Sequence, residues 1–248
     1  VGEIGRMIIL LAVLKKFNLI RFRFRLNFSP LLLRFFRKAA YQSIAMIAIW
    51  LKPIVDRAMA SWLGEGNVSI LYYADRLFII PVTFVCSGLM ATTLSHWSFR
   101  FYQSRRNTFG RDVTRAVWMV GLLALLIMIF LLIFHRPIAR IAFERGAFDS
   151  DKLSEVQRVW SYYLFGLIPF IIARIYFQAH LVLKNTHFLM GYAFCLNGLG
   201  VLLNYLLMKK LGVSGIALAT TLSYLAGAVG LGYYFYRDLD NLGEGKKE

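Results

Sequence analysis

Stretches of close to twenty apolar residues recur along this chain, separated by short connections rich in arginine and lysine. A helix of about 20 apolar residues is long enough to span the roughly 30 Å hydrocarbon core of a bilayer. The composition agrees, because 58% of the 248 residues are hydrophobic and only 17% are charged, less charge than a soluble domain carries. The sequence therefore predicts an all-α polytopic membrane protein.

Six full spans are predicted, and together they form a six-helix transmembrane bundle over residues 39–236. Before the bundle we expect the tail of a truncated transmembrane helix and then a basic cytoplasmic linker; after it we expect a cytoplasmic polar tail. The chain begins at Val1 without an initiator methionine or a signal-peptide n-region, so we interpret the start as cut from something longer. The expected spans are 39–63, 70–97, 116–134, 156–183, 188–208 and 213–236, and the flanking segments are 1–14, 15–38 and 237–248.

The basic residues predict how the spans are oriented. The linker 15–38 carries eight cations and no acid, and the connection after residue 97 carries five arginines against Asp112. Cytoplasmic loops collect lysine and arginine, so both connections are expected in the cytoplasm. The formal net charge of +16 is distributed between spans and does not line one soluble face, so nucleic acid is not a predicted partner.

Sequence signals for catalysis are missing. The chain has no G-x-S-x-G, no H-E-x-x-H and no phosphate-binding glycine loop, and its four histidines lack zinc-ligand spacing. Cys86 and Cys195 lie inside apolar runs, which is typical of small buried hydrophobes. We therefore predict no enzymatic activity, no metal and no cofactor.

Charged residues inside the first two spans need an explanation, because charge is costly there. Arg57 lies nine residues before the turn at Gly66 and Arg76 lies ten after it, so both have a similar depth, roughly 13 to 15 Å from the turn. In such a hairpin we expect Asp56 to face Arg76 and Asp75 to face Arg57.

Lys52 adds a third cation, at i, i+4 from Asp56 and so on the same helix face. Arg174 lies near the middle of the fourth span with no acid nearby in sequence. These groups could pair structurally or extend to the headgroups. Alternatively they mark a cavity with surplus positive charge, which would favour an anionic ligand.

Four blocks in this order resemble the MurJ (MviN) lipid II flippases of the MOP transporter superfamily. They are MASWLGEGNVSILYYADRLFIIPV at 59–82, FERGAF at 143–148, GLIPFIIARIYF at 166–177 and GVSGIALATTLS at 212–223. Members of that family have fourteen transmembrane helices, arranged as two six-helix lobes and a terminal pair. The resemblance implies that this chain is the end of helix six followed by helices seven to twelve, which is the second lobe alone. Its implied partners are the missing first lobe and membrane lipids.

The resemblance also implies a function. It implies a central cationic cavity that binds the anionic head of lipid II and moves it by alternating access across the bacterial cytoplasmic membrane. The alternatives are a transporter of another polyprenyl-linked glycan and a non-transporting module that binds a glycolipid. Arg76 occupies the family's cavity arginine position, with Asp75 to position or balance it. The substrate-binding residues expected on these grounds are Arg76, Asp75, Arg174, Lys52, Asp56 and Arg57.

Overall fold

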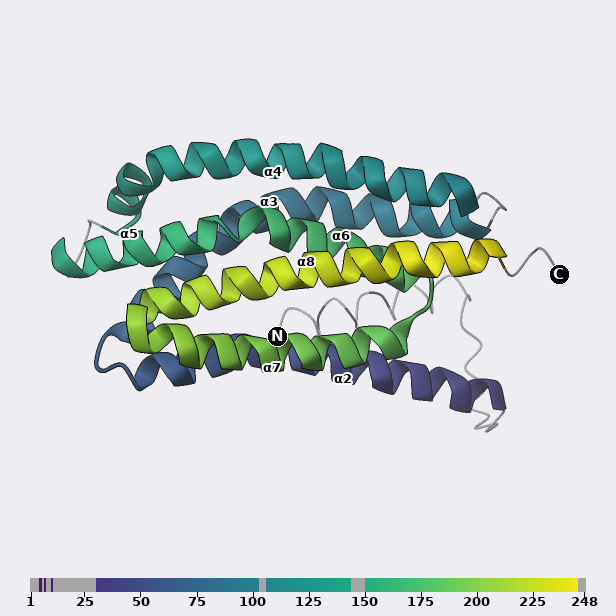
Figure 1. Cartoon of the computed structure of the whole chain (residues 1–248), viewed down its shortest axis with the longest axis horizontal. Coiled ribbons are helices and arrows are strands. Elements are labelled where there is room, and N and C mark those ends of the chain that lie inside the picture. The colour runs from purple at the N-terminus through teal and green to yellow at the C-terminus, as the bar shows by residue number, and fades with distance from the viewer. Residues whose placement is uncertain are drawn as a thin grey trace. The chain divides into compact units, whose positions relative to one another are not determined.

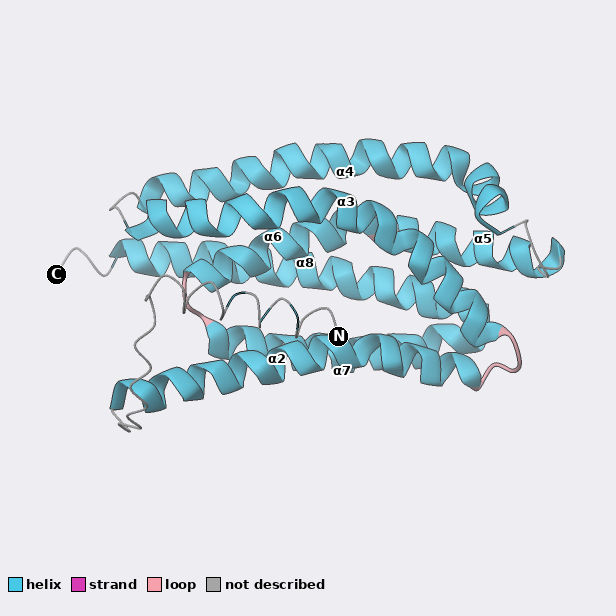
Figure 2. Ribbon diagram, turned by 180° about the vertical axis from the view of Figure 1, so that it is seen from behind, coloured by secondary structure: helices cyan, strands magenta, loops and turns pink. Residues whose placement is uncertain are grey.

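The computed structural model describes residues 5, 7, 10, 30–102, 106–143 and 150–244. Within these residues the secondary structure is helical, without strands, which confirms the predicted fold class (Figure 1, Figure 2). The FERGAF block after Phe143 and most of the segments 1–14 and 15–38 lie outside the described residues. The long helices are α2 (Pro30–Ser61), α3 (Asn67–Tyr102), α4 (Arg106–Phe143), α5 (Ser150–Leu164), α6 (Leu167–Val182), α7 (Thr186–Leu211) and α8 (Val213–Glu244).

The chain divides into two units, Val1–Lys38 and Ala39–Glu248. The first unit contributes the opening turns of α2, and positions 5, 7 and 10 are helical. The second unit is the helical bundle, in which α8 packs chiefly against α6 and α7. In the same unit α3 and α4 both pack against α5 and α6.

Helices occupy all six predicted spans. By length and apolar composition, α3, α4, α7 and α8 contain stretches able to cross a membrane, and the α5–α6 pair makes a fifth when counted as one span. The described part of α2 is not among them, because Lys52, Asp56 and Arg57 reduce its apolar character. That α2 spans the membrane stays a prediction.

The fourth predicted span is broken into α5 and α6, which meet at a bend of 43°. Pro169, in the first turn of α6, has no N–H to donate to the carbonyl four residues earlier, so the helical ladder cannot run through. The carbonyl of Tyr162 accepts a hydrogen bond from the Thr221 hydroxyl of α8 at 2.8 Å. A side chain of a neighbouring helix thus satisfies a backbone group at the break, as the membrane interior requires.

The core of the second unit lies between α4, α5, α6 and α8 and is rich in large side chains. Phe109 of α4, Trp160 of α5, Ile171 of α6 and Phe235 of α8 are all fully or almost fully buried. The outer side of α4 is apolar too, with Trp118 76% exposed. An apolar side chain exposed in this way is suited to contact with lipid, as expected for a span.

Small residues permit the close approach of α7 and α8. Gly212 ends α7 with φ +59° and turns the chain directly into α8. A Cβ atom at Gly215 would collide with the backbone carbonyl of Leu207. The close approach of the two helices therefore requires a residue without a side chain at position 215.

Candidate functional site

Two charged residues meet across the α2–α3 hairpin. The Arg57 Nη2 atom of α2 lies 4.0 Å from the Asp75 Oδ2 atom of α3. The turn between the helices has Gly64 and Gly66 at positive φ, and the Asn67 amide donates to the Leu63 carbonyl at 2.9 Å. The predicted pairing of Arg57 with Asp75 is therefore confirmed, because equal helical rise on the two arms brings them to the same level.

The phenol ring of Tyr72 is shared by two arginines. The Arg57 guanidinium carbon lies 5.1 Å from the ring centre and the Arg76 guanidinium carbon lies 4.9 Å from it. Both distances are within the range of a cation–π interaction. The Arg57 and Asp75 side chains keep 39% and 34% of their surface exposed, so this group remains open to a ligand.

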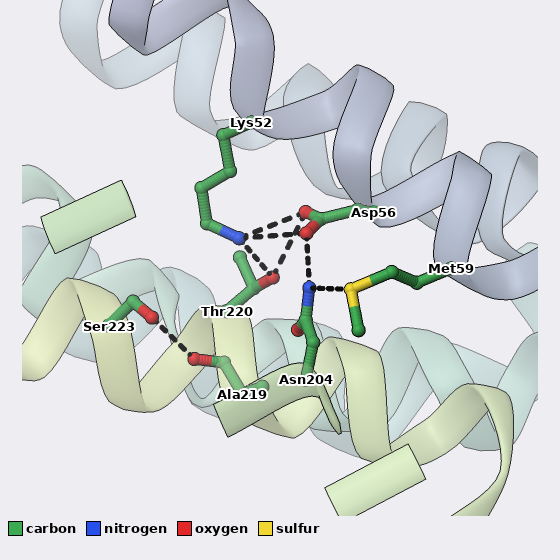
Figure 3. A network of polar contacts seen from close by, with 7 residues as sticks. All are labelled: Lys52, Asp56, Met59, Asn204, Ala219, Thr220 and Ser223. Atoms are coloured by element: carbon green, nitrogen blue, oxygen red, sulfur yellow. Dashed lines mark hydrogen bonds and ion pairs between the residues drawn. The ribbon is translucent and has the colours of Figure 1, made fainter. Parts of the chain in front are cut away.

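A second polar group lies on the other side of α2, where it meets α7 and α8 (Figure 3). The Lys52 ammonium donates to the two carboxylate oxygens of Asp56 at 2.9 and 3.1 Å. It also donates to the Thr220 hydroxyl of α8 at 3.0 Å. The Asn204 amide of α7 donates to Asp56 Oδ1 at 2.6 Å.

Asp56 is 7% exposed, and its partners Asn204 and Thr220 are buried as well. A carboxylate in such a place is tolerated when it is paired and hydrogen-bonded. The expected pairing of Lys52 with Asp56 is confirmed. The expected pairing of Asp56 with Arg76 is wrong, because the carboxylate points toward α7 and α8 and is occupied there.

The two groups adjoin, because Asp56 and Arg57 are consecutive residues of α2. Five of the six predicted site residues are therefore linked by contacts or by adjacency into one cluster: Lys52, Asp56, Arg57, Asp75 and Arg76. The cluster has three cations and two acids, which leaves one positive charge in surplus.

Arg174 lies on α6, outside the α2–α3 hairpin that carries the other five predicted site residues. Its guanidinium carbon lies 5.9 Å from the ring centre of Phe177 on the same helix, α6. The expectation that Arg174 shares a substrate site with the cluster stays a prediction.

A cleft of about 140 Å³ lies beside Lys52 and Asp56, between α2 and α7. Pockets for drug-sized ligands have roughly 300 to 1,000 Å³, so this cleft is too small for a sugar-peptide head. The described residues hold no group of three or more histidine, cysteine or acidic side chains suited to a metal. The cleft is lined by Leu51, Lys52, Val55, Asp56, Phe194, Asn197 and Val201.

Sequence reasoning missed Tyr72, Asn204 and Thr220. Tyr72 lies one helical turn before Arg76, and that spacing could have indicated a contact. Asn204 and Thr220 are uncharged polar residues inside apolar spans, and their signal is weak. No local pattern assigns them to Asp56, which is 148 and 164 positions away.

The sequence model of one protein family, lipid II flippase MurJ, matches residues 1–246. The chain belongs to this family. A probable lipid II flippase MurJ of Helicobacter pylori strain J99 is 30% identical over 196 residues, which are 77% of this chain and 41% of that protein. The corresponding protein of Thermotoga maritima is 24% identical over 213 residues, 84% of this chain and 43% of that one.

Solved structures show the same fold. A lipid II flippase MurJ in an inward closed conformation superposes with a TM-score of 0.72 at 22% identity, covering 93% of this chain and 48% of that one. The Vibrio cholerae MATE transporter VcmN gives a TM-score of 0.72 at 15% identity and covers 82% and 46%. The chain thus spans less than half the length of these MurJ and MATE relatives, which is the share that one lobe of a two-lobe transporter would have.

Proposed function

We propose that this chain is the second lobe of a flippase that carries lipid II across the bacterial cytoplasmic membrane by alternating access. The observation that supports the proposal is the cluster on α2 and α3, with its surplus positive charge and a guanidinium group open to a ligand. In a member of the MurJ family, that charge suits the pyrophosphate of a lipid-linked precursor. The partner that completes the site is the first lobe.

Arg76 has the main role in this proposal. Its planar guanidinium can donate paired hydrogen bonds to phosphate oxygens. Among the described residues it has no hydrogen bond or ion pair of its own, so its donors are available to a ligand. Asp75 offsets part of the positive charge and keeps Arg57 on the same side of the hairpin.

Transport breaks no bond, so the protein has to shelter a charged head while the lipid tail stays in the membrane. Transporters built from two lobes do this by rocking the lobes around a central site. The small cleft of this lobe agrees with a head-group site that needs both lobes. Moving one charge through 100 mV is worth about 2.3 kcal/mol, so the membrane potential can bias the direction.

The proposal is tested in cells depleted of their own lipid II flippase, by expressing the native polypeptide that contains this chain. Arg76→Ala should abolish rescue at normal membrane abundance. Arg115→Ala, which removes an exposed arginine of α4 outside the cluster, is the matched control and should rescue.

Rescue by Arg76→Ala at equal abundance would contradict the role of Arg76. Failure of the unmutated protein to rescue would contradict lipid II as the substrate and favour another polyprenyl-linked glycan. That reading would then be tested with cells that lack the flippase of such a glycan.

A further inference from the structure

Tyr72 has an unusual position between two cations of different helices. It precedes Arg76 by one turn of α3, and Arg57 reaches the same ring from α2. The two guanidinium carbons are at most 10.0 Å apart, since 5.1 and 4.9 Å separate them from the shared ring centre. Two positive charges repel at this distance, so an attractive contact has to offset the repulsion between the guanidinium groups.

We propose that Tyr72 is a positioning residue that holds Arg57 and Arg76 together as a two-arginine clamp for the pyrophosphate of a lipid-linked substrate. The inference rests on the proposed function and adds the residue that holds the two arginines of its site together. The negative face of an aromatic ring attracts cations. One ring in contact with both guanidinium groups offsets their repulsion without neutralising either.

A carboxylate could also hold two arginines together, and the site contains one. Asp75 lies 4.0 Å from the Arg57 guanidinium, beyond the range of a hydrogen bond. A full ion pair would occupy the donors that a phosphate needs. Contact with a ring face leaves the N–H groups in the guanidinium plane available, and Arg57 remains 39% exposed.

The number of guanidinium groups favours a pyrophosphate over a single phosphate. The clamp has two of them, and each can bind one phosphate through paired hydrogen bonds. A monophosphate can use one guanidinium fully, whereas linked phosphates can use both. Selectivity for pyrophosphate is therefore the property that depends on holding the two arginines together.

The test measures dissociation constants of the purified native polypeptide in lipid nanodiscs for three probes: a short prenyl pyrophosphate, the matching prenyl monophosphate and inorganic pyrophosphate. We expect the unmutated protein to prefer the prenyl pyrophosphate to the monophosphate by at least about tenfold. Tyr72→Leu should weaken pyrophosphate binding about fivefold and monophosphate binding less than twofold. Tyr72→Phe keeps the ring and should behave like the unmutated protein.

Tyr205→Leu is the matched control. Tyr205 also has a cation one turn later on its helix, with the Lys209 ammonium 4.0 Å from the ring centre, but it lies outside the cluster. A general loss of folding would lower the binding-competent fraction for all probes and leave the selectivity unchanged.

Each result has a distinct meaning. Unchanged selectivity in Tyr72→Leu, or a loss in Tyr72→Phe equal to that in Tyr72→Leu, would overturn the role of the ring and leave the proposed function intact. Binding of inorganic pyrophosphate as tight as that of the prenyl form would support the clamp but contradict a lipid-linked ligand. An unmutated protein that binds none of the three probes would overturn both proposals.

Discussion

Replacing Lys52 by methionine should destabilise the bundle by about 2 to 3 kcal/mol. The substitution keeps an apolar stem of similar length but removes the ammonium that donates to both oxygens of Asp56 and to Thr220. Asp56, 7% exposed, would then hold a negative charge with no cation in contact. An uncompensated buried charge is the cause of the expected loss.

Two measured ranges bracket the magnitude. Breaking a well-buried ion pair by removing one partner costs about 3 to 5 kcal/mol, whereas an average hydrogen bond between membrane helices contributes about 0.6 kcal/mol. The Lys52 side chain is 17% exposed, and Asp56 keeps the Asn204 amide at 2.6 Å. Both facts place the cost below the range for a fully buried pair, yet well above a single hydrogen bond.

The free energy of unfolding would be measured in mixed micelles by denaturant titration, with fluorescence of the buried Trp160 among the signals. Lys210→Met, at an exposed lysine of α7, is the matched control and should change stability by less than about 0.5 kcal/mol. A double-mutant cycle with Asp56→Asn should give a coupling free energy of about 2 kcal/mol. A loss in Lys52→Met no larger than that of the control would refute the argument that the pair is buried and stabilising.

Two further substitutions test the packing around α8 by the same titration. Gly215→Ala should cost about 1 to 3 kcal/mol, because its Cβ would meet backbone that cannot move freely; Gly198→Ala, with open space at its Cβ, should be neutral or slightly stabilising. Thr221→Val should cost about 1 to 3 kcal/mol by leaving the carbonyl at the α5–α6 break unpaired, whereas Thr83→Val removes a hydroxyl that bonds within its own exposed turn and should change little. Equal losses in either pair of variants would contradict the reasoning.

The sequence was sufficient to place the helices, because membrane spans are recognised by length and apolar composition alone. It was less successful at the fourth span, expected as one helix over 156–183 and found as α5 and α6. The signal was present in Gly166 and Pro169, since proline removes a backbone donor. At the break the Gly166 N–H donates to the Tyr163 carbonyl, so the Tyr162 carbonyl lacks its usual helical donor. Its partner is the Thr221 hydroxyl of α8, and no local pattern reveals that partner.

The charged site was likewise predictable from the sequence only in part. Arg57 and Asp75 belong to neighbouring arms of one hairpin, so counting residues from the turn was enough to pair them. Asp56 is different, because its partners come from α7 and α8. Which face of α2 those helices meet is decided by tertiary packing, and a depth count cannot distinguish faces.

The adjacency of Asp56 and Arg57 explains how one helix serves two purposes. Successive residues of an α-helix point about 100° apart, so Asp56 can face α7 and α8 while Arg57 faces α3. Lys52 and Asp56 neutralise each other internally, and the surplus charge of the cluster therefore resides on Arg57 and Arg76. Substitutions of the two cations should therefore have different effects. Loss of the Lys52 ammonium should lower the free energy of unfolding, whereas loss of the Arg76 guanidinium should lower substrate binding at unchanged stability.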